Sequence, residues 1–417
     1  MKMDPATPQS AWHAITASYL GWTLDAFDFF VVVFMVDILS KHFAVQKSAI
    51  VWSITATLAM RPFGALLFGV LADRFGRRKP LIANVVFFSL MELLCGFAPN
   101  YTAFLILRIL FGIGMGGEWG LGASLAMESA PQKKRGLISG ILQSGYASGY
   151  LLAAIATRTI LPTFGWRVMF WAGGLPALLA FYISWQVKET EAWKQHKAPG
   201  IKVIIGAAAS SWKTFLYLAG LMTLMHALSH GTQDLYPDFL KSVHAFTTTR
   251  VSYIAMFYNV GAIIGGILFG HMSEHWGRRR AMITALAVSL CVMPFWAFSS
   301  TTLALALGAF VMQVGVQGAW GIIPAHLNEM APDKLRGLVP GFAYQIGILF
   351  AAPTNSIEYA LRDRFGYSWA LASFEIVVIV LLSAALMLGY ERKGKNFIAL
   401  QEPVVPTHSC ENFAPTD

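Results

Sequence analysis

The chain has few charged residues for its length and very few cysteines. Only 13% of its 417 residues are charged and three are cysteines, whereas a soluble protein of this size carries about 25% charged residues. The three thiols argue against a disulfide framework, and Cys95 and Cys291 fall within apolar stretches, where packing is their expected role. The hydrophobic fraction is correspondingly high, at 56%. This composition excludes an ordinary soluble domain and predicts a polytopic membrane protein.

Apolar stretches of about 20 residues, the length that a membrane helix needs, recur from end to end. The fold class predicted from them is an all-α membrane protein with 12 transmembrane helices. Residues 1–13 are short and polar and show no cleavable signal. The helices are expected near residues 14–38, 49–71, 80–98, 102–124, 137–158, 167–187, 214–239, 249–271, 281–299, 302–323, 337–358 and 368–390.

The net charge of +9 would suit a nucleic-acid partner, but its distribution indicates a different cause. With both termini in the cytoplasm, most of the basic residues fall in cytoplasmic loops, which is the bias that orients membrane proteins. We therefore expect a multi-pass protein of the cell (inner) membrane whose partner is the lipid bilayer, with no nucleic acid bound. The basic residues on that side include Arg74, Arg77, Arg78, Lys79, Lys133, Lys134, Arg135, Arg278, Arg279, Arg280, Arg392 and Lys393.

Two basic loops resemble each other, GVLADRFGRRKP at 69–80 and GHMSEHWGRRRA at 270–281. An offset of 201 residues aligns them, and the same offset aligns Glu128 with Glu329. Coincidence does not keep one register through so many residues, so the chain is predicted to be two six-helix halves in the same orientation. The expected parts are an N-terminal bundle at 1–187, a cytoplasmic connector at 188–213, a C-terminal bundle at 214–391 and a disordered cytoplasmic tail at 392–417.

The residues that repeat are typical of a hinge between helices. Glycines let helices approach closely at membrane depth, and an acid four residues before the first Arg of each loop can form ion pairs that lock one helix arrangement. Anchoring by positive charge alone is the alternative, but it would not require the glycines or the acids. The expected gate and scaffold residues are Gly69, Asp73, Gly76, Arg77, Arg78, Glu128, Arg135, Gly270, Glu274, Gly277, Arg278, Glu329 and Arg336.

These loops, with the E…P…RG run that follows helices 4 and 10, resemble the major facilitator superfamily. The match covers nearly the whole chain. The resemblance implies two pseudo-symmetric six-helix bundles that rock about a central cavity, which opens alternately to either side of the membrane. We expect the protein to work as a monomer.

Polar residues present in only one half need a reason other than the scaffold. A charge at bilayer depth costs about 2.5–3.5 kcal/mol on insertion scales, so such a residue is a functional candidate. A structural ion pair between helices, such as Arg108 with Glu118, is the alternative. The charged residues that align with alanine in the other half are Arg61, Arg108 and Glu118.

Helix 1 contains the segment GWTLDAFDFF, in which Asp25 and Asp28 are three residues apart. Residues at this spacing share one helical face, so both carboxyl groups are expected to point the same way. The alternative is that one of them only neutralises Arg61 or Arg108.

Helix 7 places a polar stripe, SHGTQD at 229–234, inside an apolar segment. His226, His230 and Asp234 are successive i,i+4 neighbours, and Gln233 lies in the adjacent row. Lipid cannot solvate these groups, so the stripe is expected to face the protein interior. A single histidine would more simply be a packing residue, but packing does not account for the whole stripe. Pro237 is expected to break the helix.

Together these residues provide for an anion and for a proton. A guanidinium binds a carboxylate through two parallel hydrogen bonds, and Asp, Glu and His in a dry cavity can load and release protons. The predicted function is secondary active symport of a small carboxylate with a proton, with no cofactor beyond the proton gradient. The expected proton-coupling residues are Asp25, Asp28, Glu118, Asp234 and His230.

Several segments are similar to signatures of the sialate:proton symporter family, which includes yeast lactate and pyruvate permeases and bacterial sialic acid transporters. They are SHGTQDLYP, MRPFGALLFG around Arg61, YQIGIL at 344–349, GMGGEWG and ETEAW. The resemblance implies that Arg61 binds carboxylate and that Gln345 faces substrate. The short 188–213 connector, without the extra helices that sialic acid carriers often have, favours a monocarboxylate such as lactate or pyruvate. The expected substrate-binding residues are Arg61, His230, Gln233, Gln345, Tyr146 and Arg108.

Other functions fit the sequence less well. A symporter of aromatic acids, dicarboxylates or sialic acid is the main alternative, because Tyr146 and Tyr344 could line an aromatic pocket or merely pack. A drug antiporter would have a proline in helix 5, and a non-transporting sensor would have a longer tail. An enzyme is not expected, since the GxGxxG match at 112–117 lies in an apolar helix. Scattered histidines without ligand spacing indicate no metal site.

Overall fold

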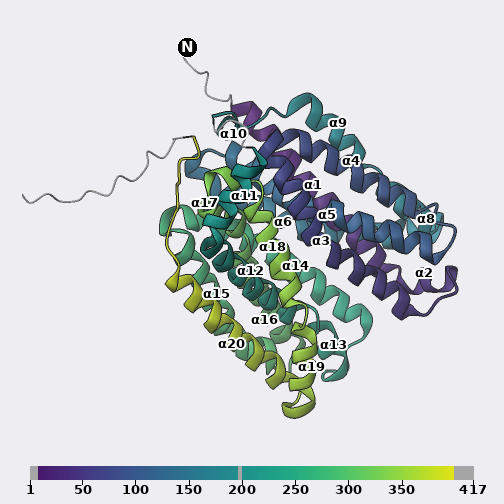
Figure 1. Ribbon diagram of the computed structural model, residues 1–417. Coiled ribbons are helices and arrows are strands. Elements are labelled where there is room, and N and C mark those ends of the chain that lie inside the picture. The colour runs from purple at the N-terminus through teal and green to yellow at the C-terminus, as the bar shows by residue number, and fades with distance from the viewer. Residues whose placement is uncertain (1–7, 196–199, 399–417) are drawn as a thin grey trace, which may run out of the picture.

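The structure, a computed structural model, describes residues 8–195 and 200–398; these residues form helices and no strands, as predicted. Figure 1 shows two bundles, one from each half of the chain. The N-terminal bundle contains α1 (Pro8–Phe34), α2 (Val36–His42), α3 (Lys47–Phe75), α4 (Arg78–Cys95), α5 (Tyr101–Ser129), α6 (Arg135–Thr159), α7 (Leu161–Phe164), α8 (Trp166–Ala172) and α9 (Pro176–Gln186), with the 3₁₀ turn η1 (Gln132–Lys134). The C-terminal bundle contains α12 (Trp212–Gln233), α13 (Tyr236–Ser242), α14 (Thr248–Trp276), α15 (Arg278–Ala297), α16 (Thr302–Trp320), α17 (Ile323–Met330), α18 (Val339–Ala351), α19 (Thr354–Phe365) and α20 (Tyr367–Leu388), with η2 (Asp333–Leu335).

The outer faces of the bundles are apolar. In the described part of the chain, eight helices are long and apolar enough to cross a membrane, and a ninth span results when the bent α11–α12 segment is included. Large side chains such as Phe181 and Trp185 are 69% and 74% exposed, which suits contact with lipid rather than water. The remaining expected spans are α4, α6 and the pair α18 and α19, which carry charges, polar residues or a break.

The 201-residue repeat of the sequence recurs in the packing. In the N-terminal bundle α3 crosses α5 where Gly64 lies against the backbone of Ile113. In the C-terminal bundle α14 crosses α16 where Gly265 lies against the backbone of Val314. A Cβ atom at either glycine would overlap the facing backbone, so glycine is what permits the close crossing. The two crossings are separated by 201 residues in both partners.

Five of the expected helices are interrupted, and the first of them, expected at 14–38, breaks at Met35 into α1 and α2. The segment expected at 167–187 breaks at Gly173–Gly174 into α8 and α9, and that at 214–239 breaks after Gln233 into α12 and α13. The break lies just before Pro237, as predicted, because proline lacks the N–H that would continue the helix. Similar breaks separate α16 from α17 and α18 from α19, next to Pro324 and Pro353.

The connector contains two short helices, α10 (Glu191–Gln195) and α11 (Ile201–Ser210). The tail prediction needs correction: the structure describes residues 392–398, and Phe397 is only 3% exposed. A composition without apolar periodicity indicated disorder, but one aromatic side chain is enough to dock this segment. Residues 399–417 of the expected tail lie outside the described residues.

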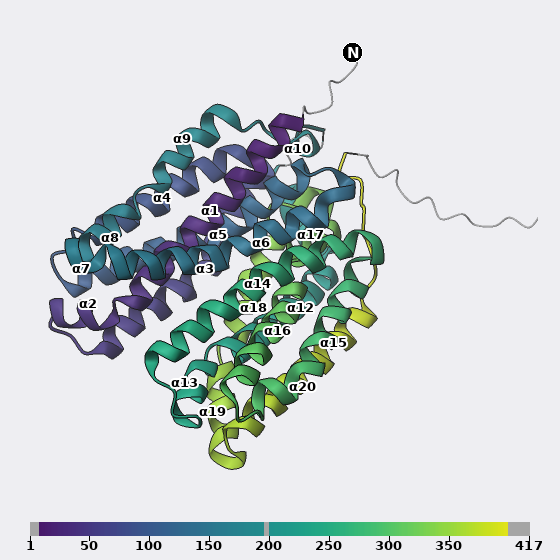
Figure 2. The ribbon, with the colours of Figure 1, turned by 180° about the vertical axis from the view of Figure 1, so that it is seen from behind.

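The two bundles meet at one end of the molecule and diverge at the other. The end that carries residues 74–79 and 276–280 is named the basic-loop end. Close to this end the two bundles touch, because Gly120 of α5 lies against Gly341 of α18. Figures 1 and 2 show from opposite sides that α2 is well separated from α13 and α19 at the far end. Close backbone contact at one end only is the geometry of a hinged pair of bundles.

Candidate functional site

Ion pairs cross between the bundles at the basic-loop end. Arg77 donates to Glu128 at 2.8 Å and to Asp73 at 3.0 Å. The Asp73 carboxylate also accepts from the backbone N–H of Gly337 at 2.7 Å and of Leu338 at 3.0 Å, in the other bundle. An acid of α3 therefore satisfies backbone donors just before α18, where a helix start attracts negative charge.

The second half repeats these contacts with the bundles exchanged. Glu274 accepts from the backbone N–H of Gly136, and Arg278 binds Glu329 through two hydrogen bonds of 2.9 and 3.0 Å. Arg135 reaches the same carboxylate across the boundary at 3.1 Å. Asp73 and Glu274 are 201 residues apart, and so are Gly136 and Gly337. The hydrogen bond from Gly337 to Asp73 and that from Gly136 to Glu274 are therefore related by the internal symmetry of the chain.

The fourth crossing pair is Arg336 with Glu128, at 3.4 Å. It is the symmetry mate of Arg135 with Glu329. The side chains of these four residues are at most 4% exposed. Buried ions cost much free energy unless each is paired, and here every one of the four has a partner in the opposite bundle. Four expected gate residues are therefore brought together in one buried network.

The glycines among the expected gate residues are required for two different reasons, close packing and backbone conformation. Gly69 lies against the backbone of Leu338, 2.8 Å from where a Cβ would stand, and Gly270 contacts the backbone of α6. Gly76 and Gly277 have φ of +95° and +92°, which side-chain-bearing residues rarely adopt. Arg78 stays outside the network, because its guanidinium contacts a main-chain carbonyl of α9 in its own bundle.

The end of the described chain covers this network. The ring of Phe397 contacts the guanidinium of Arg135, at 3.8 Å, and that of Arg336, at 4.0 Å. Lys395 pairs with Asp333 at 2.9 Å, and its carbonyl accepts from Arg135 at 3.0 Å. Cations from both bundles thus share one aromatic ring, so residues 394–397 form a strap over the joined ends.

Replacing the strap's aromatic ring should loosen the joined ends. We expect Phe397→Ala to lower the free energy needed to separate the joined ends by about 1–3 kcal/mol, because each cation–π contact contributes up to about 2 kcal/mol. A cysteine in place of Ser124, whose hydroxyl donates to the Arg336 carbonyl at 2.7 Å, should then react about 5- to 100-fold faster with a polar thiol reagent. Ile398→Ala, at the 47% exposed neighbour, is the matched control. Equal labelling rates in both variants would remove the strap's role.

Deeper in the molecule, Arg61 lies near the middle of α3, 4% exposed. Six arginines are buried in the described residues, and five of them have carboxylate partners. Within residues 8–195 and 200–398, Arg61 forms no ion pair, and its Nε and Nη2 atoms have no hydrogen-bond partner. A buried guanidinium with free donors is costly, so this is the position where an anion would be stabilised.

Arg61 faces both bundles. The phenol of Tyr146 interacts electrostatically with Arg61, Asp25 and Asp234, so the two bundles share this region. Gln345 of α18 donates to the carbonyl of Gly116 at 3.3 Å, and Gly116 packs directly on the backbone of Arg61. Other groups in electrostatic contact with Arg61 are Glu118 of α5, His226 and His230 of α12, and Tyr344 of α18.

The structure does not bring Arg108 into this group. Arg108 binds Glu92 of α4 at 2.6 Å and stacks over the ring of Phe111 at 4.1 Å. The ion pair weighed from the sequence, Arg108 with Glu118, is not formed. Asp28 is oriented toward this Arg108–Glu92 pair, where it interacts electrostatically with both residues. Arg108 is therefore neutralised inside the N-terminal bundle.

The acids of α1 and α5 are buried without hydrogen-bond partners in the described part of the chain: Asp25, Asp28 and Glu118. Asp25 interacts electrostatically with both Arg61 and Arg108. Glu118 occupies the space over Gly21 of α1, where a Cβ would overlap its carboxylate. Away from the basic-loop end, the N-terminal bundle thus buries four acids, including Glu92, against Arg61 and Arg108, so two of these acids have no cation of their own.

The polar stripe predicted at the end of α12 contains both accessible and buried side chains. His230 pairs with Asp234 at 3.0 Å, and their side chains are 39% and 37% exposed. Asn355 of α19 also donates to Asp234, at 2.9 Å. His226 is buried, with Nδ1 2.7 Å from the carbonyl of Met222. Accessible and buried members therefore lie on one helix, next to Arg61.

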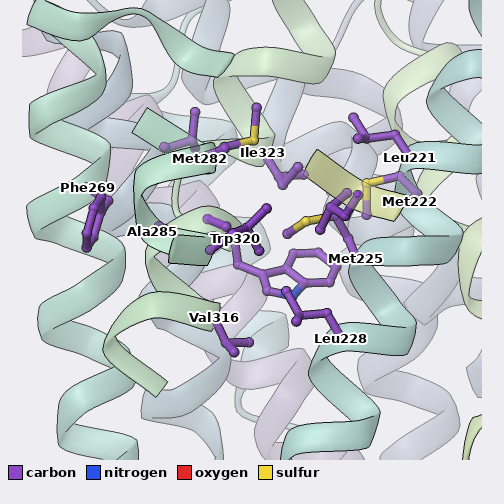
Figure 3. Packing of buried hydrophobic residues seen from close by; sticks show 14 of the residues in the cluster. Leu221, Met222, Met225, Leu228, Phe269, Met282, Ala285, Val316, Trp320 and Ile323 are labelled. Atoms are coloured by element: carbon purple, nitrogen blue, oxygen red, sulfur yellow. The ribbon is translucent and has the colours of Figure 1, made fainter. Parts of the chain in front are cut away.

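Gln233 belongs to an amide network between α12 and α16. It donates to Gln313 at 2.9 Å, and Gln313 donates to Thr232 at 3.3 Å. Gln317 reaches Ser229 at 3.5 Å. The neighbouring core is apolar: Figure 3 shows Trp320 among side chains such as Met225 and Leu228.

An aromatic cluster lies beside these polar groups. Tyr146 stacks on Trp22 with ring centroids 5.4 Å apart, and Tyr344 stacks on Trp119 at 4.1 Å. Tyr344 also meets the ring of His226 at 4.7 Å. The expected Tyr146 thus packs against Trp22 and Phe30 of its own bundle, while Tyr344 of the other bundle contacts Trp22 and Trp119.

Five further polar residues have no like residue in the other half of the chain, although none of them is among the predicted site residues. Each is polar and lies opposite an unlike residue at the 201-residue offset, as Glu92 does opposite Met293. The five are Glu92, Gln313, Gln317, Glu358 and Glu375. In the described ranges, no group of three or more His, Cys, Asp and Glu residues has the arrangement of a metal site.

Comparison with known proteins adds a family. The model of the sugar (and other) transporter family matches residues 13–200 and again 201–390. A carboxylic acid transporter protein homolog of Saccharomyces cerevisiae is 30% identical, over 94% of this chain and 70% of the relative. A probable 4-methylmuconolactone transporter of Cupriavidus pinatubonensis is 29% identical, over 94% of this chain and 92% of the relative.

The fold also has a solved counterpart. The proton:xylose symporter XylE, of the major facilitator superfamily, superposes with a TM-score of 0.76 at 19% identity, covering 93% of this chain and 98% of that one. At this identity the likeness is one of fold. It agrees with the two-bundle arrangement of this chain.

Proposed function

Because this chain belongs to the sugar (and other) transporter family and has the major facilitator fold, we propose that it carries a small monocarboxylate together with a proton. It is a membrane transporter and not an enzyme. Lactate and pyruvate are the proposed substrates. The observation that carries the proposal is Arg61, a buried guanidinium whose Nε and Nη2 donors have no acceptor in the described protein.

Arg61 suits a carboxylate better than a neutral sugar. A carboxylate accepts two parallel hydrogen bonds from one guanidinium and neutralises its charge. Gln345, Tyr146 and His230 lie around it and can supply further hydrogen bonds. We assign Arg108 no direct contact with substrate, because Glu92 already occupies its donors.

Proton coupling is assigned to the acids next to Arg61 and to the accessible His230–Asp234 pair. A carboxylate that takes up a proton loses its hold on a nearby cation, and the arginine is then free to bind substrate. Asp25 and Glu118 interact with Arg61 electrostatically. Loading of a proton and of an anion are thereby linked, since each makes the other less costly in a dry site.

Asp234→Asn tests the pair at the accessible end. The amide keeps the shape of the carboxylate but cannot take up a proton, so we expect proton-driven accumulation of lactate to fall at least about tenfold. His230→Ala should change the pH dependence of uptake. Asp363→Asn, at a 68% exposed carboxylate of α19, is the control. If both variants keep the wild-type pH profile, the proton travels elsewhere, and Asp25, Asp28 and Glu118 are tested next.

The protein is assigned to the inner membrane, with the basic-loop end facing the cytoplasm, because basic loops are retained on that side. On this assignment the buried ion-pair network closes the cytoplasmic side, and the separated helix ends face outward. Alternating access then requires the network to break while the far ends approach each other.

A second candidate is a planar aromatic or unsaturated acid. The aromatic pairs Trp22–Tyr146 and Trp119–Tyr344 lie next to Arg61, and one relative is named for 4-methylmuconolactone. Other relatives, each 25% identical, are named for sialic acid and for niacin. All of these names fit a carrier of organic acids more closely than a carrier of sugars.

A substrate panel separates these candidates. Purified protein in proteoliposomes with an imposed proton gradient is offered lactate, pyruvate, sialate, benzoate and glucose. Saturable, gradient-stimulated uptake of lactate and pyruvate supports the proposal. Preference for benzoate supports the aromatic-acid candidate, and uptake of glucose alone contradicts both.

A further inference from the structure

Two carboxyl groups that have no assigned role so far are buried in the C-terminal bundle. Glu358 of α19 is 1% exposed and Glu375 of α20 is 0% exposed. None of their four carboxyl oxygens finds a hydrogen-bond partner in residues 8–195 and 200–398. An ionised carboxylate in such surroundings is very unfavourable unless a cation or donor compensates it. Each group must therefore hold a proton while it is buried.

The glycine of the SHGTQD stripe makes room for one of them. A Cβ at Gly231 would overlap Oε1 of Glu375 and lie 2.9 Å from the ring of Phe374. His230 and Asp234 therefore lie on the accessible side of α12. The carboxyl of Glu375 packs against the backbone of the same helix at Gly231. The substitution of any larger residue at Gly231 would displace that carboxyl.

The acids form a series from accessible to buried. Asp234 is 37% exposed and is bound by His230 and Asn355. Asn355 of α19 donates to Asp234, and Glu358 lies three residues further along the same face of that helix. Gly231, three residues before Asp234, lies against the carboxyl of Glu375, and Glu375 in turn interacts electrostatically with Glu358. Successive members are thus close enough for the charge of one to affect the next.

The other charged and titratable groups of the helices packed around the pair are compensated or distant. Asp238 of α13 accepts from the hydroxyl of Tyr367 at 2.7 Å, and Arg362 of α19 pairs with Asp363 on the surface. The arginines of α15 lie at the basic-loop end, where Arg278 is bound to Glu329. No described cation therefore pairs with Glu358 or Glu375.

We propose that Glu358 and Glu375 form a second proton-binding site, inside the C-terminal bundle, which exchanges protons with the accessible side through Asp234. Each carboxylate takes one proton from a hydronium ion to give a carboxylic acid and water, and returns it when the helices rearrange. The inference rests on the proposed proton-coupled transport. It places a proton on the bundle opposite to Asp25, Asp28 and Glu118.

The competing explanation is that both acids are permanently neutral packing residues. Glutamine would then serve equally well, because it has the same shape and no charge. A site that loads and releases protons cannot tolerate glutamine. Substituting each residue in turn by glutamine therefore separates the two explanations.

The test compares wild type, Glu358→Gln, Glu375→Gln and Glu375→Asp in proteoliposomes, with Asp363→Asn as the control. Radiolabelled lactate is followed as exchange at equal pH and as accumulation under a proton gradient. In the glutamine variants the ratio of accumulation to exchange should fall at least about tenfold, since an amide cannot carry the proton. Aspartate should restore part of the ratio. Wild-type ratios in both glutamine variants would overturn the proposal.

A second measurement does not depend on the substrate. The infrared C=O band of buried carboxylic acids should titrate with external pH in wild type and in Glu375→Asp, and lose intensity in each glutamine variant. A band that never titrates, or that is unchanged in the glutamine variants, overturns the site. If wild type carries no carboxylate at all while the band titrates, the proposed substrate is wrong and the proton site stands.

Discussion

Arg61→Ala should abolish lactate uptake while the protein still reaches the membrane. Two hydrogen bonds to a charged group contribute about 1.5–3 kcal/mol each, so their loss corresponds to an affinity at least about 100-fold lower. Arg61→Lys keeps the charge but not the planar pair of donors, and we expect it to recover only part of the uptake. The measurement is the concentration dependence of radiolabelled uptake into proteoliposomes.

Arg158→Ala is the matched control, because Arg158 lies on α6 and is exposed. It should transport like wild type. Wild-type uptake by Arg61→Ala would remove Arg61 from the substrate site and with it the main support for a carboxylate.

Glu329→Gln should have the largest effect on the arrangement of the bundles. Glu329 compensates Arg278 through two hydrogen bonds and Arg135 across the bundle boundary. Breaking a buried pair by removing one partner costs about 3–5 kcal/mol, because the remaining charge is left uncompensated. The variant should melt at a lower temperature in detergent, and a cysteine placed at Ser124 should become accessible to a polar thiol reagent.

The exposed pair Asp37–Lys47 provides the control for this experiment. Both side chains are 66% exposed, so Asp37→Asn should leave the melting temperature and the labelling unchanged. Glu128, the symmetry mate of Glu329, should behave like Glu329 when changed to glutamine, since it compensates both Arg77 and Arg336. A Glu329→Gln protein with wild-type labelling and full transport would contradict the role of the network in closing this end.

The repeat in the sequence predicted much of this network. Asp73 and Glu274, with Gly136 and Gly337, were already related by an offset of 201 residues. What the sequence could not provide is the exchange of partners between bundles, by which Asp73 binds Gly337 and Glu274 binds Gly136. Such an exchange needs the two halves to face each other, and an internal offset carries no information about that.

The same limit applies to the arginines of the N-terminal bundle. Comparing the two halves selected Arg61 and Arg108 alike, since both align with alanine. The structure separates them, because Glu92 of α4 neutralises Arg108 whereas Arg61 has no acid partner within the described residues. Glu92 satisfied the same criterion, and its position in a helix of otherwise ordinary apolar pattern concealed it.

The sequence by itself determined the membrane environment, the helical class and the duplication, because these follow from the length of apolar runs, from their polarity and from the order of residues along the chain. The tertiary structure alone decided which buried charges are paired, which are free and which acids lie behind Gly231. That decision depends on side chains that approach within about 3 Å across helices far apart in the chain, and Coulomb energy at such distances varies too steeply to be inferred from sequence spacing.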